Sequence, residues 1–124
     1  KVKNAGYVIK NEREDILTMA ISDDDSAIII SFSTANISSK EISDLLKSNA
    51  LRNSENFIAT LDNNRAYINE FEAQGFYSYM IVPKKEKVKN QHTYATYVSS
   101  KKLSKNDLSK ITNTILDEAE SYIK

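Results

Sequence analysis

The chain has 124 residues, 40% of them hydrophobic and 27% charged, which suits one folded domain rather than a disordered segment. Its 17 basic and 17 acidic residues cancel, so net charge supplies no attraction to nucleic acid or to an anionic membrane. The absence of cysteine excludes disulfides, thiolate metal sites and cysteine nucleophiles.

The first periodic segments predict a β-hairpin. Apolar side chains alternate along residues 16–21, a polar turn follows at 23–26, and a second alternating run covers residues 27–33. Two alternating runs joined by a short polar turn are typical of paired antiparallel strands. A further short strand at residues 7–9 is left open.

Two segments predict helices that begin with the same pattern. Ser38 stands three residues before Glu41, and Ser104 stands three residues before Asp107. In each case the serine can cap the helix, and the acidic residue suits the first helical turn. Apolar stripes at helical spacing follow both starts: Ile42, Leu45, Leu46 and Ala50 in the first helix, and Leu108, Ile111, Ile115 and Ala119 in the second.

Four more strands are expected between and after these features. They cover residues 57–61, 65–72, 76–82 and 92–98. Gln74-Gly75 marks a turn, and Pro83 is expected to end its strand because proline cannot donate to a ladder. The order β-β-α-β-β-β-β-α predicts a single α+β domain over residues 1–124. We expect an antiparallel sheet of about six strands with two helices packed on one face.

This order of elements resembles the PsbP-like superfamily. The similar stretches are a strand at residues 26–33 leading to the first helix, the segment Asn64-Arg65-Ala66-Tyr67, and a last strand at 94–98 followed by the second helix. Members are mostly binding or assembly factors without enzyme activity, so the resemblance implies a binding role. Cystatin-like and profilin-like layouts have similar element types and stay open as alternatives.

No residue set predicts catalysis, a metal or a cofactor. His92 is the only histidine, and no serine lies in a nucleophile elbow. Residues 23–25 are three aspartates, but the spacing of a calcium loop is missing, so a solvated turn is favoured. Glu70 and Glu72 share one face of a strand, and we interpret that face as exposed. An enzyme stays an alternative only if Glu70, Glu72 or Asp62 lines a deep pocket.

Tyrosines and lysines supply the candidate contact surface. The tyrosines belong to the last strands of the predicted sheet, and the lysines form one basic loop. The predicted partner-binding residues are Tyr77, Tyr79, Tyr94, Tyr97, Lys84, Lys85, Lys87 and Lys89. Tyrosine is favoured at protein interfaces because it buries a large area at a low entropic cost. A second lysine group at residues 101–105 is expected at the opposite end of the last strand.

These features predict a non-enzymatic binding or assembly module with a protein partner and no nucleic acid. Because the sequence begins at Lys1 rather than at methionine, we expect a bacterial protein that is exported, or anchored to a membrane by lipid through a removed N-terminus. A small cytosolic immunity or adaptor protein is the alternative. The sequence leaves the oligomeric state open.

Overall fold

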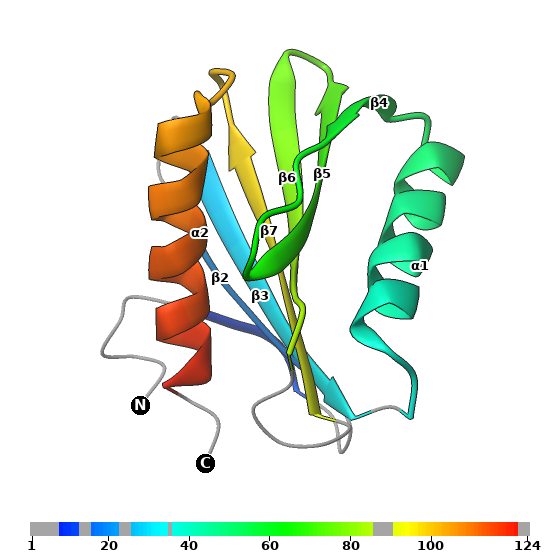
Figure 1. Ribbon diagram of the computed structural model, residues 1–124, viewed down its shortest axis with the longest axis vertical. Helices are drawn as coiled ribbons and strands as arrows, with labels where there is room; N and C mark the ends of the chain where they lie inside the picture. Colours follow the sequence, from blue (N-terminus) through cyan, green and yellow to red (C-terminus); the bar gives the residue numbers. More distant parts are fainter. Residues whose placement is uncertain (1–7, 13–15, 23–25, 35, 86–90, 122–124) are drawn as a thin grey trace.

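The computed structural model describes residues 8–12, 16–22, 26–34, 36–85 and 91–121 (Figure 1). The α+β class is confirmed, with an antiparallel sheet and two helices. The elements are β1 (Val8–Glu12), β2 (Ile16–Ser22), β3 (Ser26–Thr34), α1 (Ser39–Arg52), β4 (Asn56–Thr60), β5 (Ala66–Ala73), β6 (Phe76–Pro83), β7 (Gln91–Ser99) and α2 (Lys105–Glu120). The expectation of about six strands is corrected to seven, because the segment left open near residue 8 forms β1.

The sheet has the order β1-β2-β3-β7-β6-β5-β4, and every neighbouring pair is antiparallel. The predicted hairpin of β2 and β3 is confirmed. The last strand, β7, lies between β3 and β6 and pairs with both. Strands β1 and β4 therefore form the two edges of the sheet.

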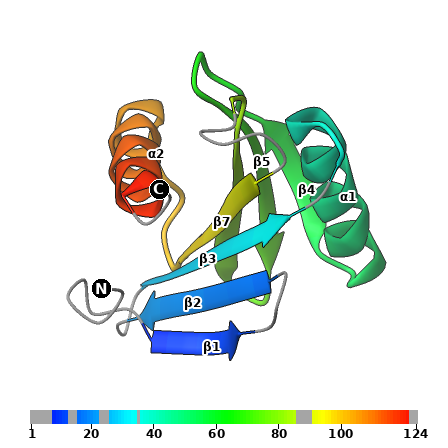
Figure 2. The same cartoon turned by 90° about the horizontal axis from the view of Figure 1, so that it is seen from below.

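The two helices cover opposite faces of the sheet, so the prediction that both pack on one face is wrong. Helix α1 contacts β5 and β6, where Asn69 Nδ2 donates a 3.2 Å hydrogen bond to Ser43 Oγ. Helix α2 packs on Ile68 and Ile81. These two residues lie on the opposite face of the sheet from Asn69. Figure 2 shows the strands between the two helices.

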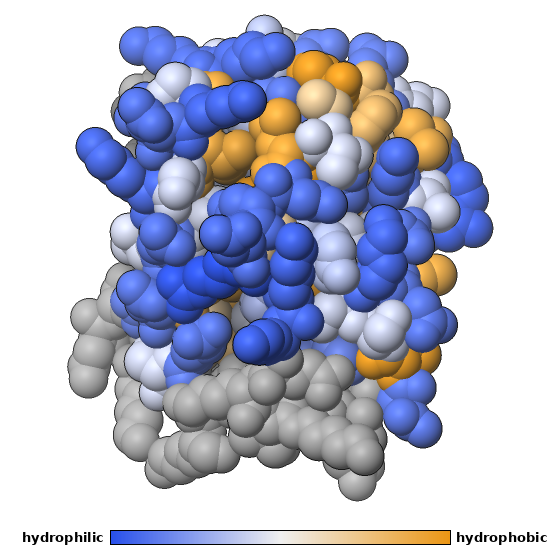
Figure 3. Space-filling view, in the orientation of Figure 1, coloured by the Kyte–Doolittle hydropathy of each residue, from blue (hydrophilic) through white to orange (hydrophobic). Residues whose placement is uncertain are grey.

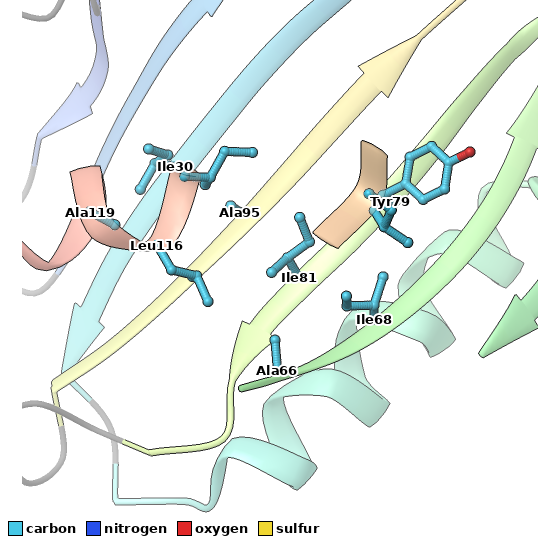
Figure 4. Packing of buried hydrophobic residues seen from close by; sticks show 10 residues of the cluster. Ile30, Ala66, Ile68, Tyr79, Ile81, Ala95, Leu116 and Ala119 are labelled. Atoms are coloured by element: carbon cyan, nitrogen blue, oxygen red, sulfur yellow. The ribbon is translucent and has the colours of Figure 1, made fainter. Parts of the chain in front are cut away.

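A buried apolar cluster forms the core beneath α2 (Figure 4). It joins four strands to one helix, and its buried members are Ile30, Ala66, Ile68, Tyr79, Ile81, Ala95, Leu108, Ile115, Leu116 and Ala119. Complete burial of one leucine or isoleucine side chain contributes about 1.5–3 kcal/mol to the stability of the fold. This cluster therefore supplies much of the energy that fixes α2 on the sheet.

Both predicted helix starts are confirmed. Ser38 and Glu41 form a reciprocal capping box, and the Ser104 side chain accepts a hydrogen bond from the Asp107 N–H. The apolar stripe of α1 is narrower than expected, because Ile42 and Ala50 are buried whereas Leu45 is 54% exposed. Helix α1 makes its main contacts with β5 and β6.

Candidate functional site

The four predicted tyrosines do not form one surface. Tyr77, Tyr79 and Tyr97 lie on the face that α2 covers, and all three pack in or against its core. Tyr94 lies three residues before Tyr97 on β7, so it is on the other face of the sheet, where it is half-buried. Tyr79 is 0% exposed, so it presents no area to a partner in this structure.

Tyr79 instead holds a buried carboxylate. Its hydroxyl donates a 2.7 Å hydrogen bond to Glu70 Oε2 and accepts a 2.9 Å bond from the Leu103 N–H. Burial, and then the bond to Glu70, raise the pKa of Tyr79 well above its usual range. Glu70 is only 2% exposed, which corrects the interpretation that this face of β5 is open to water. Lys102 Nζ lies 3.9 Å from the other Glu70 oxygen.

The lysines lie in two separate groups, as expected. Lys84 and Lys85 are exposed just beyond β6, and Lys84 Nζ lies 5.2 Å from the centre of the Tyr67 ring. Lys101 and Lys102 follow the opposite end of β7. Lys87 and Lys89 lie outside the described residues.

The three acidic residues considered for catalysis do not converge. Glu72 accepts from Asn56 Nδ2 and the Gly75 N–H, and Glu70 is bound to Tyr79. Asp62 lines a groove, but neither glutamate does. Within the described residues, no three His, Asp or Glu side chains are placed to hold a metal ion. No helix in the described part of the chain is long and apolar enough to cross a membrane.

The edge strand β4 carries the features that single out a candidate binding site. Among the strands that the structure describes, β4 pairs with β5 alone, and its five residues, Asn-Phe-Ile-Ala-Thr, include no charge and no proline. Phe57 is 38% exposed and Ile58 is 37% exposed. The pairing register shifts between Phe57 and Ala59, so Ile58 has no opposite residue on β5. An apolar area is visible over this part of the molecule in Figure 3.

A groove of about 270 Å³ runs between the end of β4 and the first half of α2. Its apolar lining comes from Leu61, Ile68 and Leu108, and its polar lining comes from Thr60, Asp62, Asn63, Lys105 and Ser109. The apolar β4 edge therefore continues into a concave surface. This combination of a strand edge and a groove is the candidate site.

Side-chain oxygens shape the corner after β4. Asn63 Oδ1 accepts hydrogen bonds from the N–H groups of Arg65 and Ala66, and Asp62 Oδ1 accepts one from the Ile68 N–H. Asn and Asp commonly replace backbone acceptors in turns in this way. Because these bonds fix the corner, Leu61 and Asp62 are held at the mouth of the groove.

A carboxylate stands at each end of β4. Glu55 precedes the strand and Asp62 follows it by two residues. Burial raises the pKa of Glu55 above its usual range. Within the described part of the chain, neither carboxylate forms an ion pair.

The sequence contains two signals for this site. The run at residues 57–61 predicts a strand, and its composition lacks the lysine or proline that often protects an edge. The position of that strand at the edge follows only from the sheet order, which places β7 beside β3. Comparisons with protein-family models, with curated proteins and with solved structures found no match.

Proposed function

We propose that this protein is a non-enzymatic binding module whose β4 edge takes an extended segment of a partner protein as an added strand. The observation that carries the proposal is the edge itself, which has one strand neighbour, exposed apolar side chains and no internal charge. Addition of a strand to such an edge gives affinity through main-chain hydrogen bonds.

Backbone groups on the open side of β4 are oriented for this pairing. The Leu61 N–H donates a 2.7 Å hydrogen bond to the Ile68 carbonyl on β5. Because successive residues of an antiparallel strand direct their backbone groups to opposite sides, the N–H and C=O of Thr60 are directed away from β5. A partner strand would pair with these groups.

The groove supports the same role. Its volume of about 270 Å³ lies below the range of about 300–1,000 Å³ that is usual for small-molecule sites. A space of that size suits an aliphatic side chain of an added strand better than a cofactor. Leu61, Ile68 and Leu108 would contact that side chain.

Residues outside β4 are further proposed contacts. Lys84 and Lys85 are exposed, and we propose that they contact a partner. Tyr94 is half-buried on the face of the sheet that α1 covers in part, and it is a proposed contact as well. The assignment to an exported or lipid-anchored bacterial protein, its cytosolic alternative and the PsbP-like relationship likewise stay predictions.

A titration with a synthetic peptide tests the proposed function. The probe is an uncharged peptide of alternating valine and threonine, about six residues long, which is a usual strand length. Amide resonances of residues 56–61 should shift on addition of this peptide to the isotope-labelled chain. Ile58→Lys should abolish the shifts, because a lysine on an edge strand opposes pairing.

Leu45→Lys is the matched control, since it introduces the same charge at an exposed aliphatic side chain on α1 that does not line the groove. The control should bind the peptide like the unmodified chain. Shifts confined to another surface, or equal binding by the Ile58→Lys variant, would contradict the proposal.

A further inference from the structure

The charges around β4 indicate which kind of segment it binds. Glu55 and Asp62 lie at opposite ends of an uncharged strand, about 23 Å apart along an extended chain at about 3.3 Å per residue. A segment paired along β4 would therefore have a carboxylate near each of its own ends.

We propose that the partner segment has an apolar centre and a lysine or arginine near each end. This inference rests on the proposed function, because it assumes that a strand is added at β4. Opposite charges that meet across paired strands are favourable, and like charges are unfavourable. Since both ends of β4 carry the same charge, the carboxylates favour basic ends whether the segment runs parallel or antiparallel to β4.

The cations near β4 do not replace this partner charge. Lys47 belongs to α1, and its Nζ lies 4.1 Å from the centre of the Phe57 ring. This cation therefore contacts the aromatic ring rather than a carboxylate at either end of β4. Lys105 belongs to the α2 wall of the groove. Neither forms an ion pair with Glu55 or Asp62 within the residues that the structure describes.

The same charges argue against a second copy of this chain as the occupant. Antiparallel pairing of two β4 strands about a twofold axis would bring Glu55 of one copy towards Asp62 of the other. Like charges at both ends would oppose that dimer. The edge is therefore protected from self-association and still open to a basic-ended segment.

Three peptides with the same valine and threonine centre test this inference: one uncharged, one with a lysine at each end and one with a glutamate at each end. At low ionic strength, we expect the lysine-ended peptide to bind about three- to tenfold more tightly than the uncharged peptide, a range set by two exposed ion pairs. The glutamate-ended peptide should bind more weakly than the uncharged one. The preference should shrink in 1 M salt, where charges are screened within about 3 Å.

A double variant, Glu55→Gln with Asp62→Asn, separates charge from shape. The asparagine oxygen can still accept the Ile68 N–H, so the corner should be kept. We expect this variant to lose the preference for lysine ends, so that its affinities for the lysine-ended and glutamate-ended peptides become close to each other. Binding of all three peptides with equal affinity would overturn the charge inference and leave the proposed function standing.

Absence of binding by all three peptides would overturn both proposals. Sedimentation of the unmodified chain over a range of concentrations tests the second copy. The chain should show no dimer that depends on the β4 edge. A concentration-dependent dimer that Ile58→Lys abolishes would show that the edge binds its own copy and would overturn the inference.

Discussion

Tyr79 and Glu70 form a hydrogen-bonded pair inside the core, with the tyrosine hydroxyl 2.7 Å from the carboxylate oxygen. The two residues lie opposite each other on β6 and β5. Because the same hydroxyl accepts from the Leu103 N–H, the pair also ties the loop before α2 to the sheet. One hydroxyl group thus connects two strands and a helix start.

Removal of that hydroxyl should destabilise the fold. Tyr79→Phe leaves the buried Glu70 carboxylate without its tyrosine donor and the Leu103 N–H without its acceptor. We expect a loss of about 2–4 kcal/mol in the free energy of unfolding, because a buried charged group that loses a partner is costly. Urea denaturation measures this loss. Tyr97→Phe, whose ring packs 6.4 Å from that of Tyr79, should cost less than about 1 kcal/mol, and an equal loss in both variants would contradict the assignment.

High pH should weaken the fold through the same residue. The pKa of Tyr79 is raised in the folded state, mainly by burial, so the unfolded chain releases this proton first, near pH 10. Stability from this group is therefore complete below about pH 10 and falls by about 1.4 kcal/mol per pH unit above it, towards the higher folded pKa. Other tyrosines and lysines also titrate there, so the measurement compares the pH slopes of unfolding for the unmodified chain and Tyr79→Phe. Identical slopes would show that Tyr79 does not contribute.

The capping box of α1 should contribute measurably to the free energy of unfolding. Ser38→Ala removes the side chain that accepts from the Glu41 N–H, and we expect a loss of about 1 kcal/mol. Ser48→Ala is the control, since Ser48 is exposed in the middle of α1 and alanine has the higher helix propensity. Thermal or urea unfolding should show the first variant less stable than the second, and the reverse order would contradict the capping role.

Arg65 links the β4–β5 corner to α2 by bonds to Asn113, Asp117 and Glu120, of which the Asp117 contact is the shortest at 2.7 Å. Arg65→Met should lower stability by about 0.5–1.5 kcal/mol, because these contacts are largely exposed. The loss should be smaller in high salt, which screens exposed charges. A loss that is independent of salt would contradict the assignment of this stabilisation to the charge of Arg65.

Local elements of the fold could be predicted from the sequence because the signals are local. Ser38 with Glu41 and Ser104 with Asp107 fix both helix starts, and Pro83 is the last residue of β6, as expected. Which face of the sheet each helix covers could not be predicted in the same way. On β5, the polar residues Asn69 and Glu70 are both buried, one on each face of the sheet, so the strand lacks the continuous apolar run that would indicate two covered faces.

The candidate site could likewise be predicted only in its local features. The sequence predicts Phe57 and Ile58 on a strand, but the position of that strand at the edge depends on which distant strand fills the centre of the sheet. The sequence alone does not separate a contact surface from the core for Tyr79, because tyrosine occurs in both. Its burial depends on Glu70, nine residues earlier, and on Leu103, which follows it by 24 residues.

The central position of β7 has a consequence for how the chain folds. Strands β1 to β3 and strands β4 to β6 can each pair locally, and in the described sheet β7 is the strand that connects these two groups. A ribosome-bound chain that ends before Gln91 would hold two unjoined half-sheets with open edges. Because closure waits for contacts between strands far apart in sequence, we expect slow folding, in milliseconds to seconds, whose late step is insertion of β7.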